Sequence, residues 1–120
     1  MQILSFGPER GEPITEYRSL YASAVALASG QGEDHVYCVH LDAGGEIGAH
    51  EAGFAQLFLV VAGSGWVSGP DGKHQVLDQG QGAFIARGEL HSKGSASGLT
   101  AIMVQLAELT TTLPQPAVMK

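Results

Sequence analysis

The chain has 120 residues, 17 of them glycine, with 15% charged residues and a formal net charge of −6 at pH 7. The six lysines and arginines form no basic stripe, so the composition argues against binding to nucleic acid or to anionic membranes. The length suits one domain with its own core, and no long apolar run or signal-like start occurs, so we expect a cytoplasmic protein.

The N-terminal part of the chain carries mixed signals. Residues 1–6 predict a short edge strand, or an arm that pairs with another subunit, and residues 7–13 predict a loop from their glycines and prolines. The alanine-rich stretch within residues 14–29 has good helix propensity, yet its larger apolar residues also alternate with small ones, as in a strand. Residues 30–34, GQGED, predict a turn.

The rest of the chain predicts short strands separated by turns. Residues 69–72, GPDG, predict a hairpin turn because Asp-Gly accepts positive φ. Residues 110–120 contain two prolines and predict a tail. The strands are predicted at residues 35–41, 57–62, 66–67, 73–77, 83–86 and 99–106.

One polar pair stands out against this apolar pattern. Gln56 stands directly before the run LFLVVA, and Phe58 shares its face because side chains alternate along a strand. His50 has the same parity just before the intervening loop. The pattern therefore offers a histidine and an amide to one side of a mostly apolar surface, which indicates a candidate site.

The spacing of four residues around this pair resembles a known family motif. Gly44, His50, Gln56 and Gly63 stand in register with the first conserved motif of the cupin superfamily. Ala52 occupies the position of the second histidine of that motif, and Gln56 replaces its glutamate.

A second stretch resembles the second cupin motif. Gly80, Gly88 and His91 match it, while Ala86 replaces its proline and Ser95 its asparagine. Two of the four metal ligands that the family motifs provide are thus altered.

The resemblance covers residues 36–106 and implies an all-β fold, a double-stranded β-helix or jelly-roll barrel of the cupin type. Regular strand spacing with turn glycines fits the same architecture. The resemblance favours strands over a helix in residues 14–29. We therefore expect a single domain, with residues 1–35 as N-terminal strands or an arm packing on the barrel, 36–108 as its core and 109–120 as a C-terminal tail.

In metal-binding cupins, three histidines and one carboxylate meet inside the barrel. The resemblance therefore makes His50, Gln56 and His91 candidate ligands of a divalent transition metal, Zn, Fe, Mn or Ni. Because Ala52 offers no donor and Gln56 no charge, we expect such a site to be weak. The same three side chains, with Phe58 beside them, can instead bind a small polar molecule, since an amide both donates and accepts hydrogen bonds.

Two functions remain open at this point. The first is a small-molecule-binding barrel with at most a weak divalent metal site. The second is a metal-dependent enzyme, similar to a dioxygenase or an isomerase, with a His/Gln/His centre and with a histidine or Glu89 moving protons. A metal-free epimerase ranks last, because none of the three tyrosines stands in a matching motif. We expect a small-molecule ligand as partner and a homodimer, because exposed sheet edges need cover.

Overall fold

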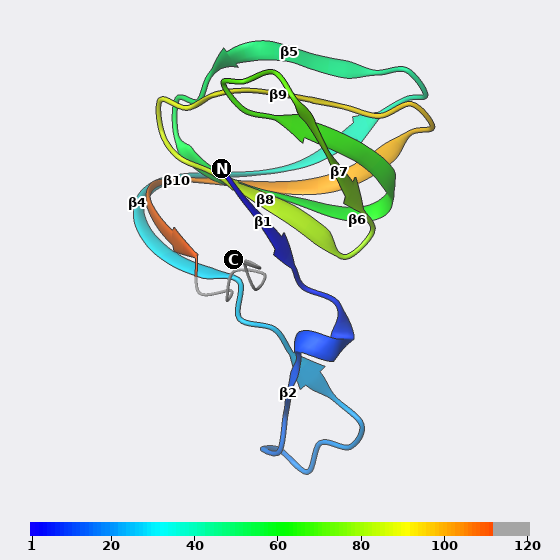
Figure 1. Ribbon diagram of the computed structural model, residues 1–120. Helices are drawn as coiled ribbons and strands as arrows, with labels where there is room; N and C mark the ends of the chain where they lie inside the picture. The colour runs from blue at the N-terminus through cyan, green and yellow to red at the C-terminus, as the bar shows by residue number, and fades with distance from the viewer. Residues whose placement is uncertain (112–120) are drawn as a thin grey trace, which may run out of the picture.

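The computed structural model describes residues 1–111, which form an all-β barrel, as predicted (Figure 1). The one helical element in this part of the chain is a 3-10 turn, η1 (Pro8–Arg10), and no helix here is long or apolar enough to cross a membrane. The strands are β1 (Gln2–Ser5), β2 (Glu12–Pro13), β3 (Ser23–Ala24), β4 (Ala28–Leu41), β5 (Glu46–Glu51), β6 (Ala55–Ser68), β7 (His74–Asp78), β8 (Gln81–Ile85), β9 (Leu90–Gly94) and β10 (Leu99–Thr111).

The barrel consists of two antiparallel sheets that share β6. The first sheet has the strand order β1-β8-β6-β10-β4, and the second joins β5, β9, β6 and β7 in that order. Strands far apart in the chain pair with each other, β1 with β8 and β4 with β10. This exchange of partners between the two halves of the chain is the pattern of a double-stranded β-helix.

Strand β6 joins the two sheets because its pairing changes at Gly63. Residues 55–63 pair with β10, and residues 64–68 pair with β7. Gly63 has φ of 77°, and a Cβ added there would collide with the carbonyl oxygen of Gly98. Only glycine combines this backbone conformation with so close an approach. The apolar run predicted as a buried strand is therefore the strand that both sheets share.

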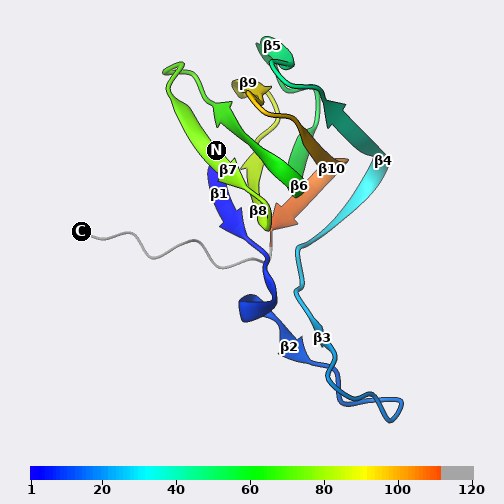
Figure 2. The same ribbon diagram turned by 90° about the vertical axis from the view of Figure 1, so that its right-hand side faces the viewer.

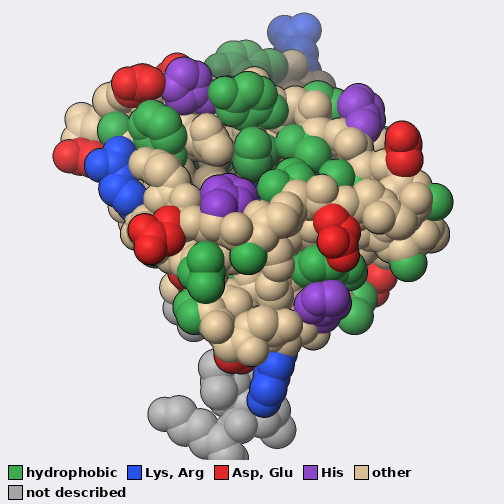
Figure 3. Space-filling view, turned by 90° about the horizontal axis from the view of Figure 1, so that it is seen from above, with side chains coloured by type: hydrophobic (Ala, Val, Ile, Leu, Met, Phe, Trp, Pro, Cys, Tyr) green, Lys and Arg blue, Asp and Glu red, His purple; other side chains and the backbone are tan. Residues whose placement is uncertain are grey.

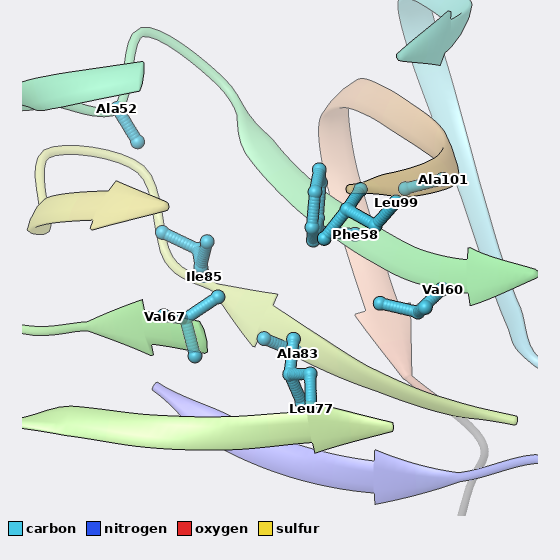
Figure 4. Close-up of a cluster of buried hydrophobic side chains, with 9 residues drawn as sticks. All are labelled: Ala52, Phe58, Val60, Val67, Leu77, Ala83, Ile85, Leu99 and Ala101. Atoms are coloured by element: carbon cyan, nitrogen blue, oxygen red, sulfur yellow. The ribbon is translucent and has the colours of Figure 1, made fainter. Parts of the chain in front are cut away.

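The inner faces of the two sheets meet in one apolar cluster, hereafter the apolar core (Figure 4). Phe58 and Val60 reach it from β6, and Leu77 reaches it from β7 in the opposite sheet. Its buried members are Ala52, Phe58, Val60, Val67, Leu77, Ala83, Ile85, Leu99 and Ala101.

A second cluster covers the outer face of the first sheet. Leu57 and Leu59 alternate with the inward residues of β6 and pack against Leu4 of β1. Burial on both faces explains why this part of β6 reads as a continuous apolar run rather than as an alternation. The cover is partial, because Val36 of β4 remains 67% exposed and Val61 of β6 remains 40% exposed.

The N-terminal residues divide between the barrel and a projecting ribbon. The predicted edge strand is confirmed as β1, which pairs with β8. Strands β2 and β3 pair only with each other among the described residues, and they extend away from the barrel (Figure 2). No helix forms within residues 14–29, in line with the strand preference, although only Ser23–Ala24 and the start of β4 are strand there.

Two predicted boundaries differ from the structure. The turn expected at residues 30–34 is wrong, because these residues lie inside β4, where Gly30, Gln31 and Asp34 pair with β10. Gly32 has φ of 95° next to an irregularity of the pairing between Leu106 and Glu108, so the glycine accompanies a bulge rather than a turn. Strand β10 also runs on to Thr111, so residues 109–111 of the expected tail are strand, and the remainder lies outside the described residues.

Candidate functional site

Two histidines meet on neighbouring strands of the second sheet. His50 of β5 is the cross-strand partner of His91 of β9. Their ring centroids lie 4.5 Å apart, with an angle of 55° between the ring planes. His91 is only 1% exposed, whereas His50 is exposed. One ring of the pair therefore lies at the surface and the other lies inside the barrel.

Backbone carbonyl groups fix the tautomer of both rings in their neutral form. Nδ1 of His91 donates to the carbonyl oxygen of Glu89 at 3.1 Å, and Nδ1 of His50 donates to that of Gly48 at 2.8 Å. Because a carbonyl oxygen can only accept, each neutral ring keeps its lone pair on Nε2. Nε2 of His91 is buried and has no hydrogen-bond partner among the described residues. Since buried polar atoms are usually paired, this nitrogen is an exception in residues 1–111, shared with Oε1 of Gln2.

Lys93 lies two residues beyond His91 on β9, so both side chains leave the same face of the strand. Its side chain is 1% exposed and crosses to the first sheet. There Nζ donates to Oε1 of Gln56 at 2.9 Å and lies 5.0 Å from the centroid of the Phe58 ring. We call Gln56, His91 and Lys93 the polar cluster. It borders the apolar core through Phe58.

Burial shifts the titration of both basic groups in the polar cluster. It lowers the pKa of Lys93 from 10.5 to about 8. It also lowers the pKa of His91, and the charge of Lys93 adds to this effect while the hydrogen bond to the Glu89 carbonyl opposes it. A histidine with a lowered pKa is neutral at pH 7, which agrees with an unprotonated Nε2.

Glu89 anchors the loop before β9. Its Oε2 accepts a hydrogen bond from the amino group of Met1 at 2.7 Å, and its Oε1 accepts one from the backbone N–H of Ala86 at 3.1 Å. A proline at residue 86, as in the family motif, has no N–H to donate. The carboxylate therefore makes a contact here that depends on this departure from the motif.

The face of the molecule on the β5 side carries several histidines. Histidines lie there among hydrophobic side chains, with acidic groups around them and few lysines or arginines (Figure 3). This face therefore combines imidazoles with apolar side chains.

Comparison with known proteins gives matches at the level of structure. A scan against models of protein families and a search of curated proteins found no match. A cupin-like protein from Thermotoga maritima superposes with a TM-score of 0.60 at 18% identity, over 68% of this chain and 72% of its own. An uncharacterised protein with a double-stranded β-helix domain from Klebsiella pneumoniae gives 0.57 at 18% identity, over 86% and 90%.

The chain has the cupin fold. A predicted oxalate decarboxylase from Thermotoga maritima matches as well, with a TM-score of 0.54 at 23% identity over 59% of this chain and 64% of its own. The barrel that the two motifs implied is thereby confirmed. Likeness at these identities establishes the cupin fold alone, because one fold carries many functions.

The residues of this cupin barrel do not fit a resident metal ion with the family's usual ligands. Ala52 is buried in the apolar core and brings no donor atom. Oε1 of Gln56 is already bonded to the ammonium of Lys93, whose positive charge opposes a cation at the same place. Within residues 1–111, no group of three or more His, Cys, Asp or Glu side chains could hold a metal ion. Of the predicted metal ligands, only His50 and His91 still offer an atom that could coordinate a metal.

The structure thus brings together two of the predicted site residues directly, His50 and His91, and connects Gln56 to them through a residue that sequence reasoning missed. Lys93 shares the strand parity of His91, so the alternation along β9 could have identified it. A lysine in a short strand usually faces solvent, and that expectation concealed the signal. Phe58 lies in the apolar core, with its ring facing the ammonium.

Proposed function

We propose that this cupin barrel binds a small polar organic molecule at the polar cluster, with His50 at the entrance. The observation that carries the proposal is the buried Nε2 of His91, which is an acceptor without a donor in the described chain. A ligand hydroxyl or N–H would supply that donor. An unfilled buried acceptor lowers stability by about 1–3 kcal/mol, and a ligand that donates to it would recover much of this cost.

The surroundings of this atom suit ligand binding. His50 stands beside it, with its own Nε2 lone pair free of the backbone contact made by Nδ1. Phe58 supplies an apolar wall, and Lys93 with Gln56 adds a donor and an amide. A few oriented polar groups on an apolar lining are the usual composition of a small-molecule site.

Ligand-observed NMR with a panel of small alcohols, amides and carboxylic acids tests the proposal. We expect wild-type protein to bind at least one of these classes, and His91→Leu to lose that binding because leucine removes the acceptor while filling similar space. His74→Leu is the matched control, since His74 is exposed and stacks on Trp66 away from the polar cluster. Absence of binding in wild type, or undiminished binding in His91→Leu, would overturn the proposal.

A weak divalent metal site is the second candidate. It is favoured by the two imidazoles, whose Nδ1 atoms both donate to backbone carbonyls and so leave Nε2 oriented, the arrangement that metal-binding histidines commonly have. A dioxygenase- or isomerase-like activity would depend on this site. Titration of Zn(II) and Ni(II) into wild type, followed by calorimetry, should show weak binding that His50→Ala abolishes. Heat changes equal in both proteins would exclude a metal bound by these histidines.

We also propose that the protein forms a homodimer through the open part of the outer sheet face and the β2–β3 ribbon. Val36 lies on that face opposite Val104, whose side chain borders the outer cluster. The ribbon exposes Tyr21 fully and Tyr17 to 92%. Two uncovered apolar surfaces on one chain are suited to cover each other in a second copy.

Light scattering coupled to size exclusion tests the dimer. We expect a dimer mass for wild type and a monomer mass for the double variant Val36→Asp, Tyr21→Ser. Lys73→Ser, at an exposed position outside both surfaces, should leave the mass unchanged. A monomer mass for wild type at micromolar concentration would contradict the proposal.

A further inference from the structure

We infer that the ligand of the barrel is a small hydroxycarboxylic acid, whose carboxylate pairs with Lys93 and whose hydroxyl donates to His91. This inference rests on the proposed function and names the ligand class of the same site. Two independent features of the polar cluster point to it, one for each functional group of the ligand.

The first feature is a buried ammonium without a counter-ion. Lys93 is 1% exposed, yet both ion pairs found in residues 1–111 involve other groups. The amino group of Met1 is also a cation in a shielded position, and it forms an ion pair with Glu89 at 2.7 Å. A buried charge that lacks such a partner is costly, and an anionic ligand would compensate it.

The contacts that Lys93 does make leave donor capacity unused. Its single hydrogen bond within the described residues goes to Oε1 of Gln56, and the face of Phe58 adds a cation–π contact. An ammonium carries three N–H donors, so two remain for a ligand. Both existing partners are formally neutral. A carboxylate would therefore be the first full negative charge on this ammonium.

The second feature is the acceptor on His91. A carboxylate oxygen cannot donate, so the anion alone would leave Nε2 unpaired and would repel its lone pair. Residues two apart on a strand lie about 7 Å apart along the backbone, with their side chains on the same face. A hydroxyl on the carbon next to the carboxylate can donate to Nε2 while the carboxylate accepts from Nζ. Lys93 and His91 would thus bind the carboxylate and the hydroxyl of one small molecule.

Three matched probes separate the two contacts. Glycolate carries the carboxylate and the hydroxyl, acetate lacks the hydroxyl, and glycolamide keeps the hydroxyl but is neutral. Binding is measured by NMR at constant ionic strength in wild type, Lys93→Met, His91→Leu and the control Lys73→Met, each checked for folding by its amide spectrum. We expect glycolate to bind wild type and Lys73→Met at least about tenfold more tightly than either other probe.

Each variant should remove the affinity that comes from one of the two contacts. Lys93→Met should weaken glycolate at least about tenfold and change glycolamide little, whereas His91→Leu should reduce glycolate to the affinity of acetate. Glycolamide binding as tightly as glycolate, or glycolate binding unchanged in Lys93→Met, would overturn this inference and leave the proposed function standing. If no probe binds and the wider panel is also negative, both fail.

Discussion

The polar cluster and the apolar core lie side by side inside one barrel, equally shielded from water but satisfied to different degrees. Every large side chain of the apolar core packs against others of its kind, as Phe58, Leu77 and Ile85 do. The polar cluster holds an ammonium with one neutral hydrogen-bond partner and an imidazole nitrogen with none in the described chain. The first region accounts for the stability of the barrel. The second reduces stability, and such local exceptions are expected at functional sites.

The largest expected effect on stability comes from a substitution in the apolar core. Leu77→Ala removes a fully buried side chain between the two sheets and should lower the free energy of unfolding by about 2–5 kcal/mol, because it removes apolar contacts and leaves a cavity. Urea denaturation followed by circular dichroism measures the change. Val76→Ala is the control on the same strand, since Val76 is largely exposed, and should stay within about 0.5 kcal/mol of wild type. Equal losses in both variants would show that Leu77 is not part of a common core.

Lys93 sharpens the contrast through the pH dependence of stability. Its pKa is about 8 in the folded protein and 10.5 in the unfolded chain, so the unfolded state binds more protons between these values. Stability should therefore rise with pH across that window, by about 3 kcal/mol in all, as the buried ammonium becomes neutral. The groups that face it, Gln56, Phe58 and neutral His91, supply no opposite charge.

Lys93→Met should remove this rise. At pH 7 its stability should stay within about 2 kcal/mol of wild type, because removing the buried charge offsets the loss of the hydrogen bond to Gln56. Urea denaturation at pH 7 and pH 10 in both proteins measures the difference. A wild-type stability that is flat or falls across this range, with Lys93→Met following the same course, would contradict the assignment of a buried, uncompensated ammonium.

His50 gives the smallest effect on stability. It is exposed, so His50→Ala should change the free energy of unfolding by no more than about 0.5 kcal/mol in thermal or urea denaturation. His50→Ala should instead weaken ligand binding while the fold stays intact. A loss of more than about 2 kcal/mol would mean that His50 is a structural part of the barrel rather than its entrance.

Much of the fold could be predicted because its signals are local. Apolar runs bounded by glycines located β6, β8 and β10. Gly80 stands at a turn with positive φ, whereas Gly63 has positive φ inside β6, so the bend expected there is a change of pairing within one strand. The turn predicted at residues 30–34 failed because a glycine inside a long strand looks the same in sequence as a glycine in a turn. Pairing with β10, made by distant residues, decided between the two.

The site was predictable only in part, for a related reason. Motif spacing placed His50 and His91 in one barrel, and the structure sets them opposite each other on β5 and β9. Motif spacing could not show that Gln56 accepts a hydrogen bond from a lysine 37 residues away, because that contact crosses between the two sheets. The environment of Lys93, rather than its residue type, makes it a functional candidate.

The most direct test of the polar cluster is an NMR titration of protein carrying 13C-labelled lysine. The chain has three lysines, Lys73, Lys93 and Lys120, so the Cε signals are few and Lys93→Met assigns the one from the barrel. On addition of glycolate, we predict a saturable shift of the Lys93 signal while that of Lys73 stays in place, and a smaller shift with glycolamide. An unmoved Lys93 signal at saturating glycolate, or equal shifts at Lys93 and Lys73, would contradict a carboxylate held by the buried ammonium.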